Sequence, residues 1–95
     1  MKQCIIDVRE PAEFALDHVA GALNIPSSSL LVGAPELSTV PKDAELVVYC
    51  KTGTRSALAI ALFRALGYEN VVNGINKEQV RARLASGEKT GNTVD

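Results

Sequence analysis

The sequence has no tryptophan, a single histidine, and only two cysteines among its 95 residues. It contains no apolar run near the roughly 20 residues that a membrane-spanning helix needs. Its charges are close to balance, with ten Lys and Arg against eleven Asp and Glu and a formal net charge of −1. This balance gives the chain as a whole no electrostatic reason to bind nucleic acid or an anionic membrane surface. We therefore expect neither as a partner.

The amino-terminal residues are not expected to form a secretory signal, because the acidic Asp7 comes too early for one. We therefore expect a cytoplasmic protein. The hydrophobic content of 46% is too high for a disordered chain, and the length suits one small core. We predict a single domain over residues 1–95, with its core at 4–86. The polar, glycine-containing segment 87–95 is expected to be a flexible tail.

The small number of cysteines and histidines limits metal and disulfide chemistry. Two thiols do not indicate a disulfide framework. Cys4, Cys50 and His18 lack the paired ligand spacing of a zinc site. We predict no metal and no cofactor, which leaves a single reactive thiol as the chemistry to consider.

Short apolar segments alternate with helical patterns along the chain. We predict strands at 4–8, 22–25, 45–50 and 70–73, with Gly74 forming a turn, and helices that start near 10, 56 and 77. Segment 27–41 is expected to be loop with one helical turn. The helix from 56 has a single charge, so we expect it to be largely buried. The alternation predicts an α/β domain with a small parallel sheet and helices on both faces.

Cys50 is the candidate nucleophile because it ends a buried strand and a polar loop follows it. We call residues 50–56 the cysteine loop. Ligand crevices in parallel sheets lie at this edge, and loop amides with a helix start can converge on one point there. Lys51 and Arg55 add positive charge, and the loop has no acid. Each feature lowers a cysteine pKa, and Gly53 allows a positive φ.

Cys4 is expected to be a structural thiol. It begins its strand, at the edge of the sheet opposite Cys50. These edges lie roughly 15 Å apart, whereas a disulfide needs Cα atoms within about 7 Å. We therefore interpret Cys4 as a small buried hydrophobe.

Three blocks of sequence, in order, resemble the rhodanese (thiosulfate sulfurtransferase) superfamily, in particular its single-domain members. They are residues 6–14 (IDVREPAEF), 18–26 (HVAGALNIP) and 49–56 (YCKTGTRS). The resemblance covers about residues 4–74. It implies a rhodanese-like fold, here lacking the usual first strand and helix. The chain also has Gly74-Ile75 where the family commonly has paired glycines, and no later tryptophan.

The resemblance also implies the site residues. The loop cysteine of this family accepts a sulfane sulfur as a persulfide, so Cys50 is implied as the catalytic residue. The rest of the loop is implied to bind the substrate: Lys51, Thr52, Gly53, Thr54, Arg55 and Ser56. Arg9 is expected to pair with Asp7, and we count it among the candidate substrate-binding residues because it can face the crevice. His18 is expected to make a structural hydrogen bond.

These observations lead to one hypothesis and three alternatives. The leading hypothesis is a sulfurtransferase that takes sulfur from a small anionic donor such as thiosulfate and passes it to a thiol or cyanide. Two alternatives are a persulfide relay to a sulfur-carrier protein and a non-catalytic interaction module on the same scaffold. The third, phosphatase or arsenate chemistry, is disfavoured, because four residues separate Cys50 from Arg55, whereas the related phosphatases have five.

Overall fold

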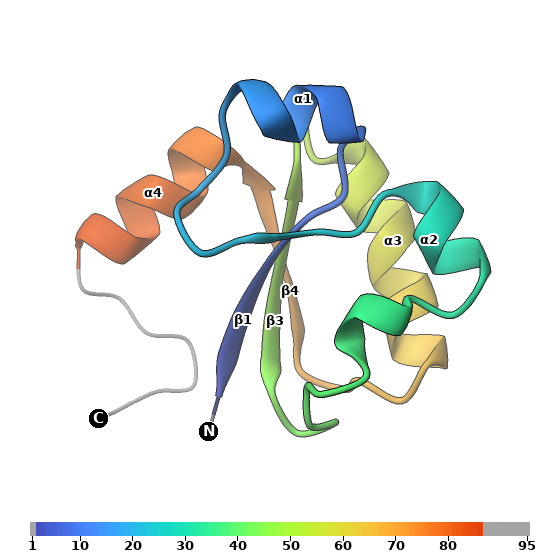
Figure 1. Ribbon diagram of the computed structural model, residues 1–95. Helices are drawn as coiled ribbons and strands as arrows, with labels where there is room; N and C mark the ends of the chain where they lie inside the picture. The colour runs from blue at the N-terminus through green and yellow to red at the C-terminus, as the bar shows by residue number, and fades with distance from the viewer. Residues whose placement is uncertain (1, 87–95) are drawn as a thin grey trace.

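The computed structural model describes residues 2–86, and the predicted tail at 87–95 lies outside this range (Figure 1). Secondary structure alternates along the chain as expected. The elements are β1 (Gln3–Asp7), α1 (Pro11–Leu16), β2 (Leu23–Asn24), α2 (Ser27–Leu31), the 3-10 helix η1 (Pro35–Leu37), β3 (Glu45–Cys50), α3 (Thr54–Ala65), β4 (Val71–Asn76) and α4 (Lys77–Ala85).

The four strands form one parallel sheet in the order β2-β1-β3-β4. Every residue of β3 is buried, because β1 and β4 pair with it on either side and helices cover both faces. Val48 and Cys50 pack in the cluster that includes α3, whereas Val47 and Tyr49 pack with Val80 of α4. The predicted α/β architecture is confirmed, and Cys50 lies at the carboxyl end of the central strand β3.

Helix α3 is less buried than its composition predicts. Only Ser56, Ala59 and Phe63 are buried in it, while Leu58 is 70% exposed and Leu62 is 41% exposed. The expectation of a largely buried helix is wrong, because α3 packs on the sheet along one side only and its outer leucines face solvent. No helix between residues 2 and 86, α3 included, combines the length and apolar character needed to cross a bilayer.

The segment 27–41 contains more structure than the single helical turn expected. It forms α2 and η1, and Leu30, Leu37 and Val40 belong to the main core. The Tyr68 hydroxyl hydrogen-bonds to the carbonyls of Leu37 and Val40, at 3.2 and 2.8 Å. These partners are 31 and 28 residues away in sequence, so local pattern alone does not reveal them.

Strand β4 continues past the predicted turn at Gly74 and ends at Asn76, so that prediction is wrong. Its register against β3 shifts between Val48 and Tyr49, which then pairs with Ile75. Ile75 has a φ of 74°, an uncommon conformation for a β-branched residue. With this shift in register, β4 continues along β3 beyond Gly74, and Asn76 pairs with Cys50.

Gly74 gives a test of this packing. A Cβ there would lie 2.6 Å from Val80 Cγ2 and 3.1 Å from Val47 Cγ1. Gly74→Ala should therefore lower the free energy of unfolding by about 1–3 kcal/mol, as overpacked cores do, measured by urea denaturation. Gly74→Ala combined with Val80→Ala should lose less than the sum of the two single changes, because the clash is relieved. Additive losses would show that Gly74 does not pack against Val80.

Candidate active site

Cys50 is buried where β3 ends and the cysteine loop begins, with only 1% of the residue exposed. It lines a hollow of about 230 Å³, which we call the cysteine hollow. The hollow is lined by Arg9, Cys50, Lys51, Asn76, Lys77 and Glu78. Cys50 therefore lies at the edge of a space large enough for a small anion, although little of the residue is exposed. Cys4 is half-buried in β1, and both cysteines are free thiols.

Two main-chain amides converge on the sulfur of Cys50. Its Sγ accepts hydrogen bonds from the N–H of Gly53 at 3.0 Å and of Ser56 at 3.4 Å, and lies 3.5 Å from Ser56 Oγ. Burial raises the pKa of the Cys50 thiol. Hydrogen bonds from the Ser56 side chain and from the amides of Ser56, Thr52 and Gly53 outweigh that effect, so the net pKa is lowered.

The turn that aims these amides depends on Gly53, whose φ is 94° as the sequence suggested. A Cβ at this position would also lie 3.3 Å from Ile75 Cγ2. Gly53 precedes the first residue of α3, Thr54, so the amides of the turn and of the first helical turn lie together. The loop is thus shaped to surround one sulfur atom with N–H groups.

Asn73 of β4 binds the cysteine loop through its side-chain amide. It was not among the site residues predicted from the sequence. Its Oδ1 accepts hydrogen bonds from the Ser56 hydroxyl at 2.7 Å and from the Ile75 N–H at 2.9 Å. Its Nδ2 donates to the Gly53 carbonyl at 3.3 Å. One amide side chain therefore connects the turn, the start of α3 and the strained residue of β4. The signal for it was a polar residue near the carboxyl end of a predicted strand.

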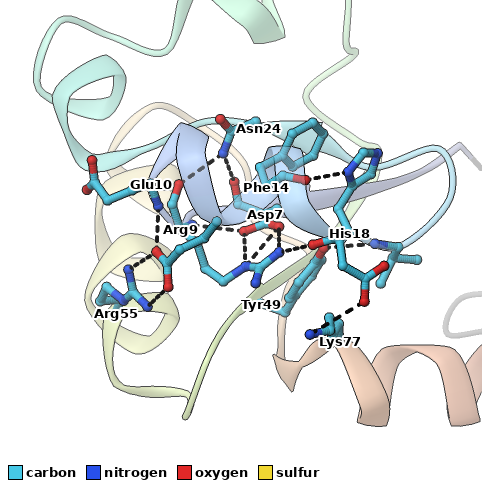
Figure 2. A network of polar contacts seen from close by, with 12 residues as sticks. Asp7, Arg9, Glu10, Phe14, His18, Asn24, Tyr49, Arg55 and Lys77 are labelled. Atoms are coloured by element: carbon cyan, nitrogen blue, oxygen red, sulfur yellow. Dashed lines mark hydrogen bonds and ion pairs between the residues drawn. The ribbon is translucent and has the colours of Figure 1, made fainter.

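Arg55 is paired with Glu13 of α1 rather than left as an uncompensated charge. The guanidinium donates to both carboxylate oxygens, at 2.8 and 3.1 Å (Figure 2). Hydrogen bonds from Arg55 and from the backbone N–H of Glu10 lower the pKa of Glu13 to about 2. The partner lies 42 residues away in sequence, so the absence of acids within the loop did not reveal it.

Arg9 and Asp7 form the expected ion pair, and it is buried. Arg9 Nε lies 3.0 Å from both oxygens of Asp7, and a terminal nitrogen lies 2.7 Å from one of them. The same terminal nitrogen donates to the carbonyl of Asp17 at 2.6 Å (Figure 2). Because Arg9 also lines the cysteine hollow, the pair fixes one positive group beside Cys50.

The other candidate residues differ in how they relate to the cysteine hollow. His18 makes the kind of structural hydrogen bond expected, with its Nδ1 2.7 Å from the Phe14 carbonyl and its ring stacked on Phe14. Thr52 and Thr54 are exposed, and their hydroxyl oxygens lie 3.5 Å apart. Neither lines the cysteine hollow, whereas Lys51 does. Asn76, Lys77 and Glu78 also line it and were missed; Asn76 is the last residue of β4, and Lys77 and Glu78 begin α4.

The fold and the geometry around Cys50 define a parallel α/β protein whose cysteine lies in an amide-lined loop at the end of the central strand. A family model described as "Rhodanese-like domain" matches residues 1–75. The chain therefore belongs to the rhodanese-like family, and the resemblance seen in its sequence is confirmed.

Several relatives carry names that describe sulfur transfer. The chain is 42% identical over 72 residues to the "Probable adenylyltransferase/sulfurtransferase MoeZ" of Mycobacterium tuberculosis. The aligned region covers 76% of this chain and 18% of that protein. It is 36% identical over 69 residues to a "Sulfurtransferase" of Allochromatium vinosum, covering 73% of this chain and 62% of the relative. The chain thus spans less than two thirds of either relative.

Solved structures support the same family assignment. A structure described as "rhodanese with anions from E. coli" matches with a TM-score of 0.69 and 33% identity, covering 81% of this chain and 89% of the other. The sulfurtransferase RDL2 of Saccharomyces cerevisiae matches with a TM-score of 0.64 and 32% identity, covering 90% and 76% respectively. The fold is that of rhodanese domains.

The Ser56 hydroxyl gives a test of how the sulfur is stabilised. Ser56→Ala removes the side-chain hydrogen bond that lowers the Cys50 pKa, so the pKa should rise. The measurement is the rate of iodoacetamide alkylation against pH, in a Cys4→Ser background that leaves one thiol. Thr54→Ala removes a nearby exposed hydroxyl and is the matched control. An unchanged pH midpoint in Ser56→Ala would exclude this role for the hydroxyl.

The Glu13–Arg55 pair predicts a pH dependence of stability. Because folding lowers the Glu13 pKa from 4.5 to about 2, the pair contributes fully above pH 4.5 and is lost as pH falls toward 2. Glu13→Gln should cost about 0.5–1 kcal/mol at pH 7, since both side chains are about one third exposed. This cost should shrink between pH 4.5 and 2 in urea denaturation.

Glu69→Gln, which removes an exposed carboxylate outside this pair, is the control for loss of one negative charge. A Glu13→Gln cost that stays constant down to pH 2 would contradict the assignment.

Proposed function

We propose that the protein is a sulfurtransferase that carries a sulfane sulfur on Cys50 as a persulfide. The observation that carries the proposal is the convergence of the Gly53 and Ser56 amides on Sγ, which favours the thiolate. A thiolate is the nucleophilic form of cysteine. Membership of a family whose relatives are named sulfurtransferases supports the same chemistry.

The first half-reaction transfers sulfur to the enzyme. The Cys50 thiolate attacks the outer sulfur of thiosulfate and forms a new S–S bond. The bond between the two sulfur atoms of thiosulfate breaks, and sulfite leaves with the electron pair. Sulfite is a stable anion, so its departure needs no proton. A cysteine loop without His, Asp or Glu is consistent with this step.

The second half-reaction returns the enzyme to its starting state. The terminal sulfur of the persulfide is anionic, and N–H groups of the cysteine loop stabilise it in the manner of an oxyanion hole. A thiol or cyanide then attacks this sulfur, and Cys50 leaves as the thiolate. Lys51 and Arg9, which line the cysteine hollow, are proposed to attract the donor. The similar E. coli rhodanese is described with anions, which supports anion binding in this fold.

A persulfide relay to a partner protein is the second candidate. It is supported by the names of MoeZ and of the relative from Ogataea parapolymorpha, both of which combine an adenylyltransferase with a sulfurtransferase. A sulfur-carrier protein would then be the acceptor. High turnover with thiosulfate and cyanide alone would count against an exclusive relay. The lowered Cys50 pKa argues against a non-catalytic module.

Intact mass after exposure to thiosulfate tests the proposal. The wild-type protein should gain one sulfur atom, and a second incubation with cyanide should remove it. Cys4→Ser is the matched control and should gain the sulfur equally, because Cys4 lies near the amino end of β1, whereas Cys50 lies at the carboxyl end of β3. Cys50→Ser should gain none. Absence of an adduct on the wild type, or an adduct on Cys50→Ser, would overturn the proposal.

A further inference from the structure

Two hollows meet beside the cysteine loop and share one wall. The cysteine hollow is one of them, and the second is lined by Arg9, Glu13, Leu16, Asp17, Lys51 and Lys77, with a volume of about 230 Å³. The shared residues are Arg9, Lys51 and Lys77, all cationic. Positive groups therefore lie between Cys50 and the surface formed by α1.

The two arginines near this wall already bind protein acceptors through part of their guanidinium groups. Arg55 is bound through two hydrogen bonds to Glu13. Arg9 is bound to both oxygens of Asp7 and to the Asp17 carbonyl. These contacts fix the orientation of both guanidinium groups, so either arginine can offer an anion in the cysteine hollow only its remaining N–H groups. The lysines are less constrained by protein partners.

Lys77 is held loosely enough to bind an incoming anion. Its Nζ lies 3.5 Å from an Asp17 oxygen and 3.8 Å from a Glu78 oxygen, both beyond the usual hydrogen-bond length of about 2.7–3.2 Å. Its backbone is nevertheless fixed, because Asn76 caps α4 through a 2.8 Å hydrogen bond from the Gln79 N–H. Lys51 has no ion pair with any residue of the range 2–86. Both ammonium groups therefore have donors to offer.

We propose that Lys77, together with Lys51, binds the anionic end of the substrate, so that Lys77 determines specificity for an anionic over a neutral sulfur donor. This inference rests on the proposed sulfurtransferase function. For a donor of the thiosulfate class, the sulfonate oxygens lie against the two ammonium groups while the outer sulfur faces Cys50. Lys77 acts on the substrate, whereas the hydrogen bonds to the Cys50 sulfur come from the cysteine loop.

Alkylation with two probes of similar size tests this inference without relying on sulfur transfer. Iodoacetate is an anion and iodoacetamide is neutral, and the Cys50 thiolate displaces iodide from the same carbon in each. The ratio of their rates, in a Cys4→Ser background, measures the preference for an anion. Lys77→Gln should lower this ratio by about twofold to fivefold, as expected for one exposed charge pair. High salt should reduce the difference.

Lys42→Gln is the matched control. Lys42 lies just before the amino end of β3, whereas Cys50 is at the carboxyl end, and its ammonium group donates to the Leu66 carbonyl. It should leave the ratio unchanged. With thiosulfate as donor, Lys77→Gln should raise KM by about threefold to fivefold, with a much smaller change in kcat. The double variant Lys51→Gln/Lys77→Gln should show a larger loss in both assays.

The outcomes separate this inference from the proposed function. An unchanged iodoacetate to iodoacetamide ratio in the double variant overturns the inference, even if a persulfide forms on Cys50. A lowered ratio with no persulfide on the wild type supports the anion site and overturns the proposed function. A ratio that falls equally in Lys42→Gln would show a general effect of net charge and would also overturn the inference.

Discussion

The structure depends on the placement of one buried sulfur atom among main-chain N–H groups. Burial by itself would keep Cys50 protonated, because a thiolate loses solvation inside the protein. Hydrogen bonds from the Ser56 side chain and from the amides of Ser56, Thr52 and Gly53 reverse that preference. These groups lie in place because the chain turns at Gly53 and enters α3 directly afterwards. The donors that stabilise the thiolate are fixed in the fold, so little reorganisation is needed during a reaction.

Two other elements of the chain, α1 and β4, keep this loop in shape. Asn73 ties it to β4, and Glu13 ties Arg55 to α1. The positive φ of Ile75, stabilised by the hydrogen bond from its N–H to Asn73, accompanies the register shift that places Asn76 beside Cys50. Backbone strain commonly accumulates at functional sites where surrounding contacts over-determine it. The rim of the site is thus built by the last strand and the helix after it.

The sequence predicted the features that depend on local pattern. The strand ending at Cys50, the polar loop and the positive φ of Gly53 followed from apolar runs and a single glycine. It did not predict the Glu13–Arg55 pair or the Asn73 contacts, which join residues 42 and 17–20 positions apart. The exposure of Leu58 was missed for a related reason, since composition does not show how many sides of a helix have neighbours. Likewise, Gly74-Ile75 looked like a turn because the pairing with β3 that continues the strand is non-local.

The most direct test is a titration of both thiols in one sample, by NMR of protein labelled with carbon-13 at the cysteine Cβ atoms. Burial raises the pKa of Cys4 despite nearby Lys2, whereas the hydrogen bonds of the loop lower that of Cys50. The Cys50 signal should therefore shift at clearly lower pH than the Cys4 signal. A Cys50 signal that titrates with Cys4, or above it, would contradict the central role given to the loop amides.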